Sequence, residues 1–153
     1  MKYYIVGGTK FQRYVADQTI GYMCKKLKLT RYPSLEVMVS LKDLQEDYHG
    51  LCYVTNGKDV LYRVRELAVE IHKKLPLFDF VRTICHEFIH VKQYAVGEIR
   101  EDLVNGKAKW KSKRVPMDTP YLEQPWEKEA FKYESEYAFE VLSAVKIDMT
   151  GEA

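Results

Sequence analysis

Residues 77–96 read LFDFVRTICHEFIHVKQYAV, and the stretch is bounded by Pro76 and Gly97. Apolar residues recur along it at the spacing of one helix side: Ile84, Phe88, Val91 and Ala95, widened by Val81 and Cys85. A proline just before a helix and a glycine just after it are typical start and stop signals. The stretch therefore predicts a helix from Leu77 to Val96 with one buried side.

This predicted helix contains His86-Glu87-Phe88-Ile89-His90, the HExxH pattern. Helix positions four apart lie on the same face, so the two imidazoles can bind one metal ion. Glu87 would then lie beside a metal-bound water, as the general base of a zinc hydrolase does. The alternative is a solvated helix face that carries two histidines by chance. The helical context favours the metal site.

A catalytic zinc site needs three protein ligands and one open position. The other two histidines, His49 and His72, both precede the motif, so a carboxylate is the expected third ligand. The segment PWEKEAF at 125–131 opens the last helical pattern of the chain. In it, Glu127 and Ala130 form an E-x-x-A stretch, whose small residue would let this helix approach the first one closely.

We therefore expect His86, His90 and Glu127 to bind one Zn²⁺ ion. The alternative for Glu127 is an ordinary acidic residue in a helix's first turn, where the macrodipole favours it. Glu98 and Glu101, which follow the motif helix closely, remain alternatives for the third ligand.

Three segments, TICHEFIHVKQYA at 83–95, GEI at 97–99 and QPWEKEA at 124–130, resemble small HExxH metallopeptidases of the gluzincin type. More narrowly, they resemble the minimal, often phage-encoded proteins labelled SprT-like. The resemblance covers roughly the C-terminal half, and it implies a zincin-like domain in which Glu127 is the third ligand. Two departures stand out. Many gluzincins have an acid where this chain has Phe131, and SprT proteins have a downstream histidine that this chain lacks.

The implied reaction is peptide-bond hydrolysis, in which Glu87 takes the water's proton and returns it to the leaving amine. A donor should stabilise the developing oxyanion, and we name Tyr94, one turn beyond the motif. The alternatives are Tyr121, Tyr137 and His72. Glu134, two turns past Glu127, or Glu98 could accept from a ligand imidazole, although both could equally be surface acids.

The remaining pattern is α+β. We expect a small mixed or antiparallel sheet packed on an N-terminal helix, the motif helix and a C-terminal helix. We expect a strand at 2–6 and a helix from Thr9 to about Leu27, where Gln12 completes a capping box with Thr9. Strands are expected at 35–41 and 50–55, followed by a turn at Asn56-Gly57. From Asp59 we expect an extended region with Leu67, Val69 and Ile71 on one face. In gluzincins an edge strand directly before the motif helix binds the substrate backbone, and the strand at 67–71 could do the same here. The alternative is an ordinary strand of the sheet.

A basic run, Lys107 to Arg114, follows Asn105-Gly106. As the second strand of a hairpin it would place its lysines on one face and Trp110 on the other. Such a ribbon could bind a phosphate backbone, or it could be a solvated face or a protected sheet edge. We favour the solvated face. The alternative function is a metal-binding but non-proteolytic module that binds nucleic acid or protein through this hairpin.

Composition sets the frame. A length of 153 residues predicts one domain, 1–153. Its content of 46% hydrophobic and 30% charged residues is typical of a globular protein. The net charge of +2 is too small to imply a polyanionic partner. Cys24, Cys52 and Cys85 are odd in number and lack C-x-x-C spacing, which favours a reducing compartment. Without a signal-peptide or membrane-span pattern, we expect a cytoplasmic enzyme, in the host cytoplasm if phage-encoded, acting on a peptide or protein substrate.

Overall fold

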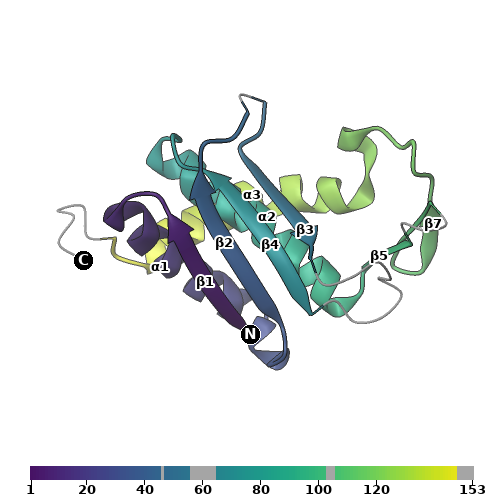
Figure 1. Ribbon diagram of the computed structural model, residues 1–153, viewed down its shortest axis with the longest axis horizontal. Helices are drawn as coiled ribbons and strands as arrows, with labels where there is room; N and C mark the ends of the chain where they lie inside the picture. Colours follow the sequence, from purple (N-terminus) through teal and green to yellow (C-terminus); the bar gives the residue numbers. More distant parts are fainter. Residues whose placement is uncertain (46, 56–64, 103–105, 148–153) are drawn as a thin grey trace.

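The computed structural model describes residues 1–45, 47–55, 65–102 and 106–147. Its larger sheet has four strands in the order β1 (Lys2–Gly7), β2 (Glu36–Lys42), β4 (Glu66–His72) and β3 (Gly50–Val54). The first three are parallel, and β3 pairs with β4 in the antiparallel sense and forms one edge. The helices lie behind one face of this sheet in the view of Figure 1. The predicted α+β fold with a small mixed sheet is confirmed.

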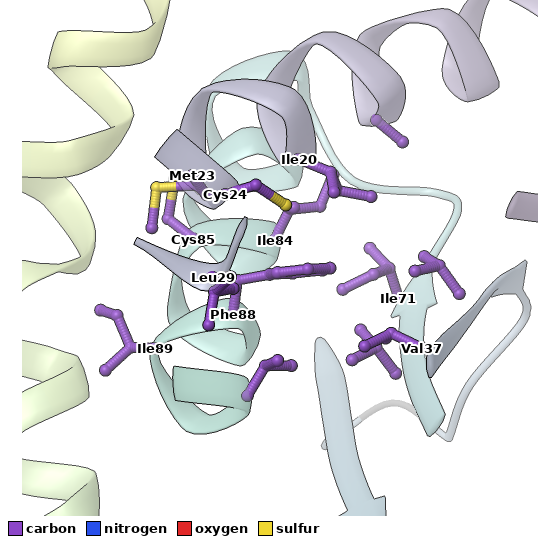
Figure 2. Close-up of a cluster of buried hydrophobic side chains, with 14 of the residues drawn as sticks. Ile20, Met23, Cys24, Leu29, Val37, Ile71, Ile84, Cys85, Phe88 and Ile89 are labelled. Carbon is purple, nitrogen blue, oxygen red and sulfur yellow. The ribbon is translucent and has the colours of Figure 1, made fainter. Parts of the chain in front are cut away.

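The core lies between this sheet and two helices, α1 (Lys10–Lys26) and α2 (Leu77–Val96). Alternate residues of the two central strands are buried: Val37, Val39, Leu41, Leu67, Val69 and Ile71. Figure 2 shows side chains from both helices and the sheet meeting in this space. The third helix, α3 (Pro125–Ala144), packs on the far side of α2, so α2 lies between the sheet and α3.

Both predicted helix signals are confirmed. Thr9 caps α1 by a capping box, in which its hydroxyl accepts from the Gln12 N–H (3.1 Å) and the Gln12 amide accepts from the Thr9 N–H (2.8 Å). Gly97 ends α2 with a φ of 89°, a conformation that glycine adopts without strain. The motif helix thus begins and ends where the sequence predicts.

The strand directly before α2 is β4, and it lies inside the sheet because β2 and β3 pair with its two sides. The suggestion that this strand is a substrate-binding edge is therefore wrong, and the alternative, an ordinary strand of the sheet, is correct. The edge on this side of the sheet is β3. It precedes β4 in the sequence but pairs with the outer side of β4, so that β4 lies next to β2.

A second, three-stranded antiparallel sheet contains β5 (Ile99–Asp102), β6 (Lys107–Trp110) and β7 (Lys113–Val115). Along β6, Lys107 and Lys109 are exposed and alternate with Ala108 and Trp110, which face the other side as predicted. The basic run is not one strand, however, because Lys111 and Ser112 have positive φ values of 50° and 71° and reverse the chain. This is the geometry of a two-residue hairpin turn.

Two predicted turn signals involve residues outside the described part of the chain: Asn56-Gly57 entirely, and Asn105 of Asn105-Gly106. In the described part, none of the helices combines the length and the apolar character that crossing a membrane requires.

Candidate metal centre

Three side chains from two helices converge beside the sheet. His86 and His90 lie one turn apart on α2, with ring centroids 4.9 Å from each other. Glu127 comes from the first turn of α3, where the fully buried Ala130 lets this helix pack closely on α2. All three are buried, with exposed fractions of 6%, 6% and 7%. The structure thus brings together the ligand set that the sequence predicts.

The donor atoms of these residues lie within 4.8 Å of one another and could hold a metal ion. The Nε2 atoms of His86 and His90 lie 3.0 and 3.1 Å from the Glu127 carboxylate. Ligand bonds of about 2.0–2.2 Å in a tetrahedral zinc site put donor atoms roughly 3.3–3.6 Å apart. The spacing and the donor set, two imidazoles and one carboxylate, are those of a group that could hold a metal ion.

Hydrogen bonds join His86 and His90 to Glu127 and shift the pKa values of these groups. Burial acts to lower the pKa of His86, but its hydrogen bonds to Glu127 and Glu134 outweigh this and raise the pKa to about 10. Burial likewise acts to raise the pKa of Glu127, yet both histidines hold it down to about 2. The two histidines and Glu127 thus favour each other's charged forms.

The outer nitrogen of each imidazole also has a partner. His86 Nδ1 lies 3.0 Å from Glu134 Oε2, as the sequence suggests. His90 Nδ1 lies 2.7 Å from the Oε1 atom of Gln93, a residue that our sequence analysis missed. Its position three residues after His90 on the same helix was the available signal. Such partners orient ligand histidines in metal sites.

Phe131 takes the position where many gluzincins have an acid. Its ring meets the His86 ring edge to face, with centroids 4.8 Å apart. The carboxylate partner of His86 comes instead from Glu134, almost one turn further along α3. His86 therefore has a carboxylate partner although position 131 is a phenylalanine.

The two alternative third ligands are engaged elsewhere. Glu98 forms ion pairs with Lys92 and Lys111. Glu101 accepts a hydrogen bond from the Tyr94 hydroxyl at 3.1 Å. Glu127 is the carboxylate that joins the two histidines.

A cleft of about 730 Å³ opens over these residues. Its walls include residues 47–52, at the start of β3, and Phe131 of α3. Gly50 lets β3 approach α2 closely, since a Cβ atom there would lie 2.8 Å from Thr83 Cγ2 and 3.1 Å from Glu87 Cγ. The edge strand therefore lies directly beside the motif helix at the site.

Glu87 lines the same cleft, beside the histidines, and is 5% exposed. Burial raises its pKa to about 7, although both neighbouring histidines oppose this shift. A carboxylate with a pKa near neutrality can accept and return a proton under ordinary conditions.

Of the four proposed oxyanion donors, Tyr121 is the one that lines the cleft. It begins the short 3₁₀ helix η2 (Tyr121–Glu123), and burial and its hydrogen bond to Glu127 raise its pKa. Tyr94 is buried and donates to Glu101 instead. Tyr137 stacks on Tyr133, and His72 Nδ1 accepts from the Leu44 N–H. For the oxyanion donor, the geometry favours Tyr121 over Tyr94, the residue that we predicted from the sequence.

Comparison of the chain with protein-family models, curated proteins and solved structures finds no match.

Proposed function

We propose that the protein is a zinc-dependent metallopeptidase, with His86, His90 and Glu127 as zinc ligands. The observation that carries the proposal is the convergence of these three donors beside Glu87 in an open cleft. Zinc is the proposed metal because two imidazoles and one carboxylate, with a further position open, are a ligand set of catalytic zinc sites.

In the proposed reaction, a bound zinc ion would polarise a water molecule and the substrate carbonyl. Glu87 accepts the proton of the attacking water and then donates it to the leaving amine. Tyr121, which lines the cleft, would donate a hydrogen bond to the carbonyl oxygen as negative charge develops there. The Phe131 ring packs against the ring of His86, one of the proposed ligands.

The proposed substrate is a peptide or protein segment in an extended conformation. β3 is an edge of the larger sheet, and its first residues line the cleft. An extended backbone can add to such an edge as a further strand. Because Gly50 brings this edge close to Glu87, a bound segment would pass beside the proposed base.

The metal site is tested first, by elemental analysis of purified protein. We expect about one zinc ion per chain in the wild type and a clear loss in Glu127→Ala, since three protein ligands become two. Glu123→Ala is the control, because it removes a nearby exposed carboxylate outside the ligand cluster. Full zinc content in Glu127→Ala would contradict the ligand set.

The reaction is tested with Glu87→Gln, which keeps the shape of the side chain but removes the base. Zinc content should be unchanged, and hydrolysis of unfolded protein substrates should fall by about 10²–10⁴-fold. Equal hydrolysis by the variant and the wild type would contradict the role of Glu87.

A second candidate function is a metal-binding, non-proteolytic module that binds nucleic acid. The register of the smaller sheet favours it, because Lys109 pairs with Arg100 on one side and with Arg114 on the other, in one basic row. Binding to DNA would then weaken steeply with salt and be lost in the double variant Lys109→Glu, Arg114→Glu. It would be unaffected by Glu87→Gln, which separates the two functions.

The proposed location is the cytoplasm. Cys24, Cys52 and Cys85 are all unbridged, as expected in a reducing compartment.

A further inference from the structure

Gln93 is a fully buried polar residue between α2 and α3, with an exposed fraction of 0%. Its Oε1 atom lies 2.7 Å from His90 Nδ1. Its Nε2 atom donates to the Trp126 carbonyl at 3.1 Å and to Glu129 Oε1 at 3.2 Å. All these partners lie in or beside the first turn of α3 or on a proposed metal ligand.

These contacts fix the orientation of the amide. A backbone carbonyl can only accept a hydrogen bond, so the group that faces Trp126 must be the NH₂ of Gln93. The amide oxygen therefore faces His90, whose Nδ1 must then carry the proton. In the neutral ring that a metal ion binds, the lone pair is then on Nε2, the atom that faces Glu127.

We infer that Gln93 is a positioning residue for the metal site and holds two of its three ligands in place. It fixes the ring of His90 directly, and it holds the first turn of α3 through Trp126 and Glu129, the residues on either side of the Glu127 segment. The inference deepens the proposed metal function and rests on it.

The side chain has to be an amide for this role. A glutamate could accept from His90, but it could not donate to the Trp126 carbonyl, and its charge would lie against Glu129. A leucine of similar size would make neither contact and would leave the polar groups of both helices without their partner. Gln93→Glu therefore keeps the contact with His90 and loses the one with Trp126, whereas Gln93→Leu loses both.

The test is the zinc dissociation constant of Gln93→Leu, measured by competition with a chromophoric chelator. We expect binding about 10–100-fold weaker than in the wild type, the usual cost of losing a group that orients a ligand histidine. Gln93→Glu keeps the acceptor toward His90 and should recover part of this loss. Unchanged zinc affinity in a folded Gln93→Leu would overturn the inference, as would equal affinities of the two variants.

The matched control is Gln12→Leu. Gln12 also makes two hydrogen bonds, to Thr9 and to the Lys73 carbonyl, but in the cap of α1. This variant should lower the melting temperature of the metal-free protein and leave zinc affinity unchanged. A purely structural role for Gln93 would give the same result as Gln12→Leu.

One measurement needs no variant and stays informative if Gln93→Leu does not fold. In ¹⁵N spectra of the zinc-loaded wild type, the proton on His90 Nδ1 should be protected from exchange, because the buried Gln93 oxygen accepts it. A proton on Nε2 would overturn the inference. A wild type that takes up no zinc would instead overturn the proposed metal function, and this inference with it.

Discussion

Helix α2 is buried on two opposite sides by different means. The side toward the sheet and α1, which we call the apolar side, consists of Val81, Ile84, Cys85, Phe88 and Val91, all with an exposed fraction of 0%. The side toward the cleft and α3, the polar side, carries His86, Glu87, His90 and Gln93, which are equally well buried. One helix therefore contributes both to the core and to the proposed metal site.

The difference lies in what each side requires of its neighbours. Apolar packing is non-directional, and its free energy scales with the area removed from water. Buried polar groups instead need a partner at a defined distance and angle. Among the described residues, no buried side-chain nitrogen or oxygen lacks such a partner. We therefore expect stability to depend mainly on the apolar side and metal affinity on the polar side.

The largest expected effect is the loss of the main apolar side chain. Phe88→Ala should lower the free energy of unfolding by about 3–5 kcal/mol, because it removes a buried ring and leaves a cavity. Denaturant unfolding of the metal-free protein measures this change.

The matched control for Phe88→Ala is Phe139→Ala. Phe139 is 63% exposed and packs on Phe78 at a centroid distance of 4.9 Å. We expect it to lower the free energy of unfolding by no more than about 1 kcal/mol. Equal losses in the two variants would contradict the assignment of stability to the apolar side.

The sequence predicts the apolar side of α2 well because its signals are local. Periodicity marks the helix, and Gly97 marks its end, since each depends only on neighbours along the chain. The proposed ligands His86 and His90 are predicted for the same reason. Glu127 is predicted from its E-x-x-A context, although it meets the histidines from a different helix.

The features that the sequence did not predict depend on distant contacts. Gln93 acquires its role only when the first turn of α3 lies beside it. The choice of Tyr121 over Tyr94 depends on where η2 meets the cleft, and the position of β3 as the edge depends on strand order. The reversal at Lys111 and Ser112 lacks the glycine or asparagine that usually signals such a turn.

An intermediate effect is expected on the polar side. Glu134→Gln should weaken zinc binding about 10–100-fold, because a carboxylate that orients His86 becomes a neutral amide. The free energy of unfolding should change far less than in Phe88→Ala. Chelator competition gives the affinity, and denaturant unfolding gives the stability.

Glu136→Gln makes the same chemical change on an exposed position of the same helix, and it should leave zinc affinity unchanged. If Glu134→Gln and Glu136→Gln bind zinc alike, the hydrogen bond to His86 has no part in holding the metal. The two sides of α2 would then differ less than the structure suggests.

The smallest expected effect, counted per pH unit, is a dependence of stability on pH that comes from the polar side. In the metal-free protein, hydrogen bonds to Glu127 and Glu134 raise the pKa of His86 to about 10 against the opposing effect of burial. A pKa raised above its unfolded value stabilises the fold fully below about pH 6.5, and this stability is lost as the pH rises toward the folded value.

Each pH unit above 6.5 should therefore lower the melting temperature of the metal-free protein by roughly 3–5 °C for this one histidine. The window should end near pH 8.5, because burial raises the pKa of Cys24 to about 11 and of Cys85 to about 12, which adds a similar loss above that point. Zinc binds deprotonated imidazoles, so the zinc-loaded protein should not show this decline. Thermal unfolding of chelator-treated and zinc-loaded samples between pH 6.5 and 8.5 measures the difference. Parallel curves for the two samples would mean that the imidazoles of the metal-free site are already neutral, and that the polar side is held by neutral hydrogen bonds rather than by charge.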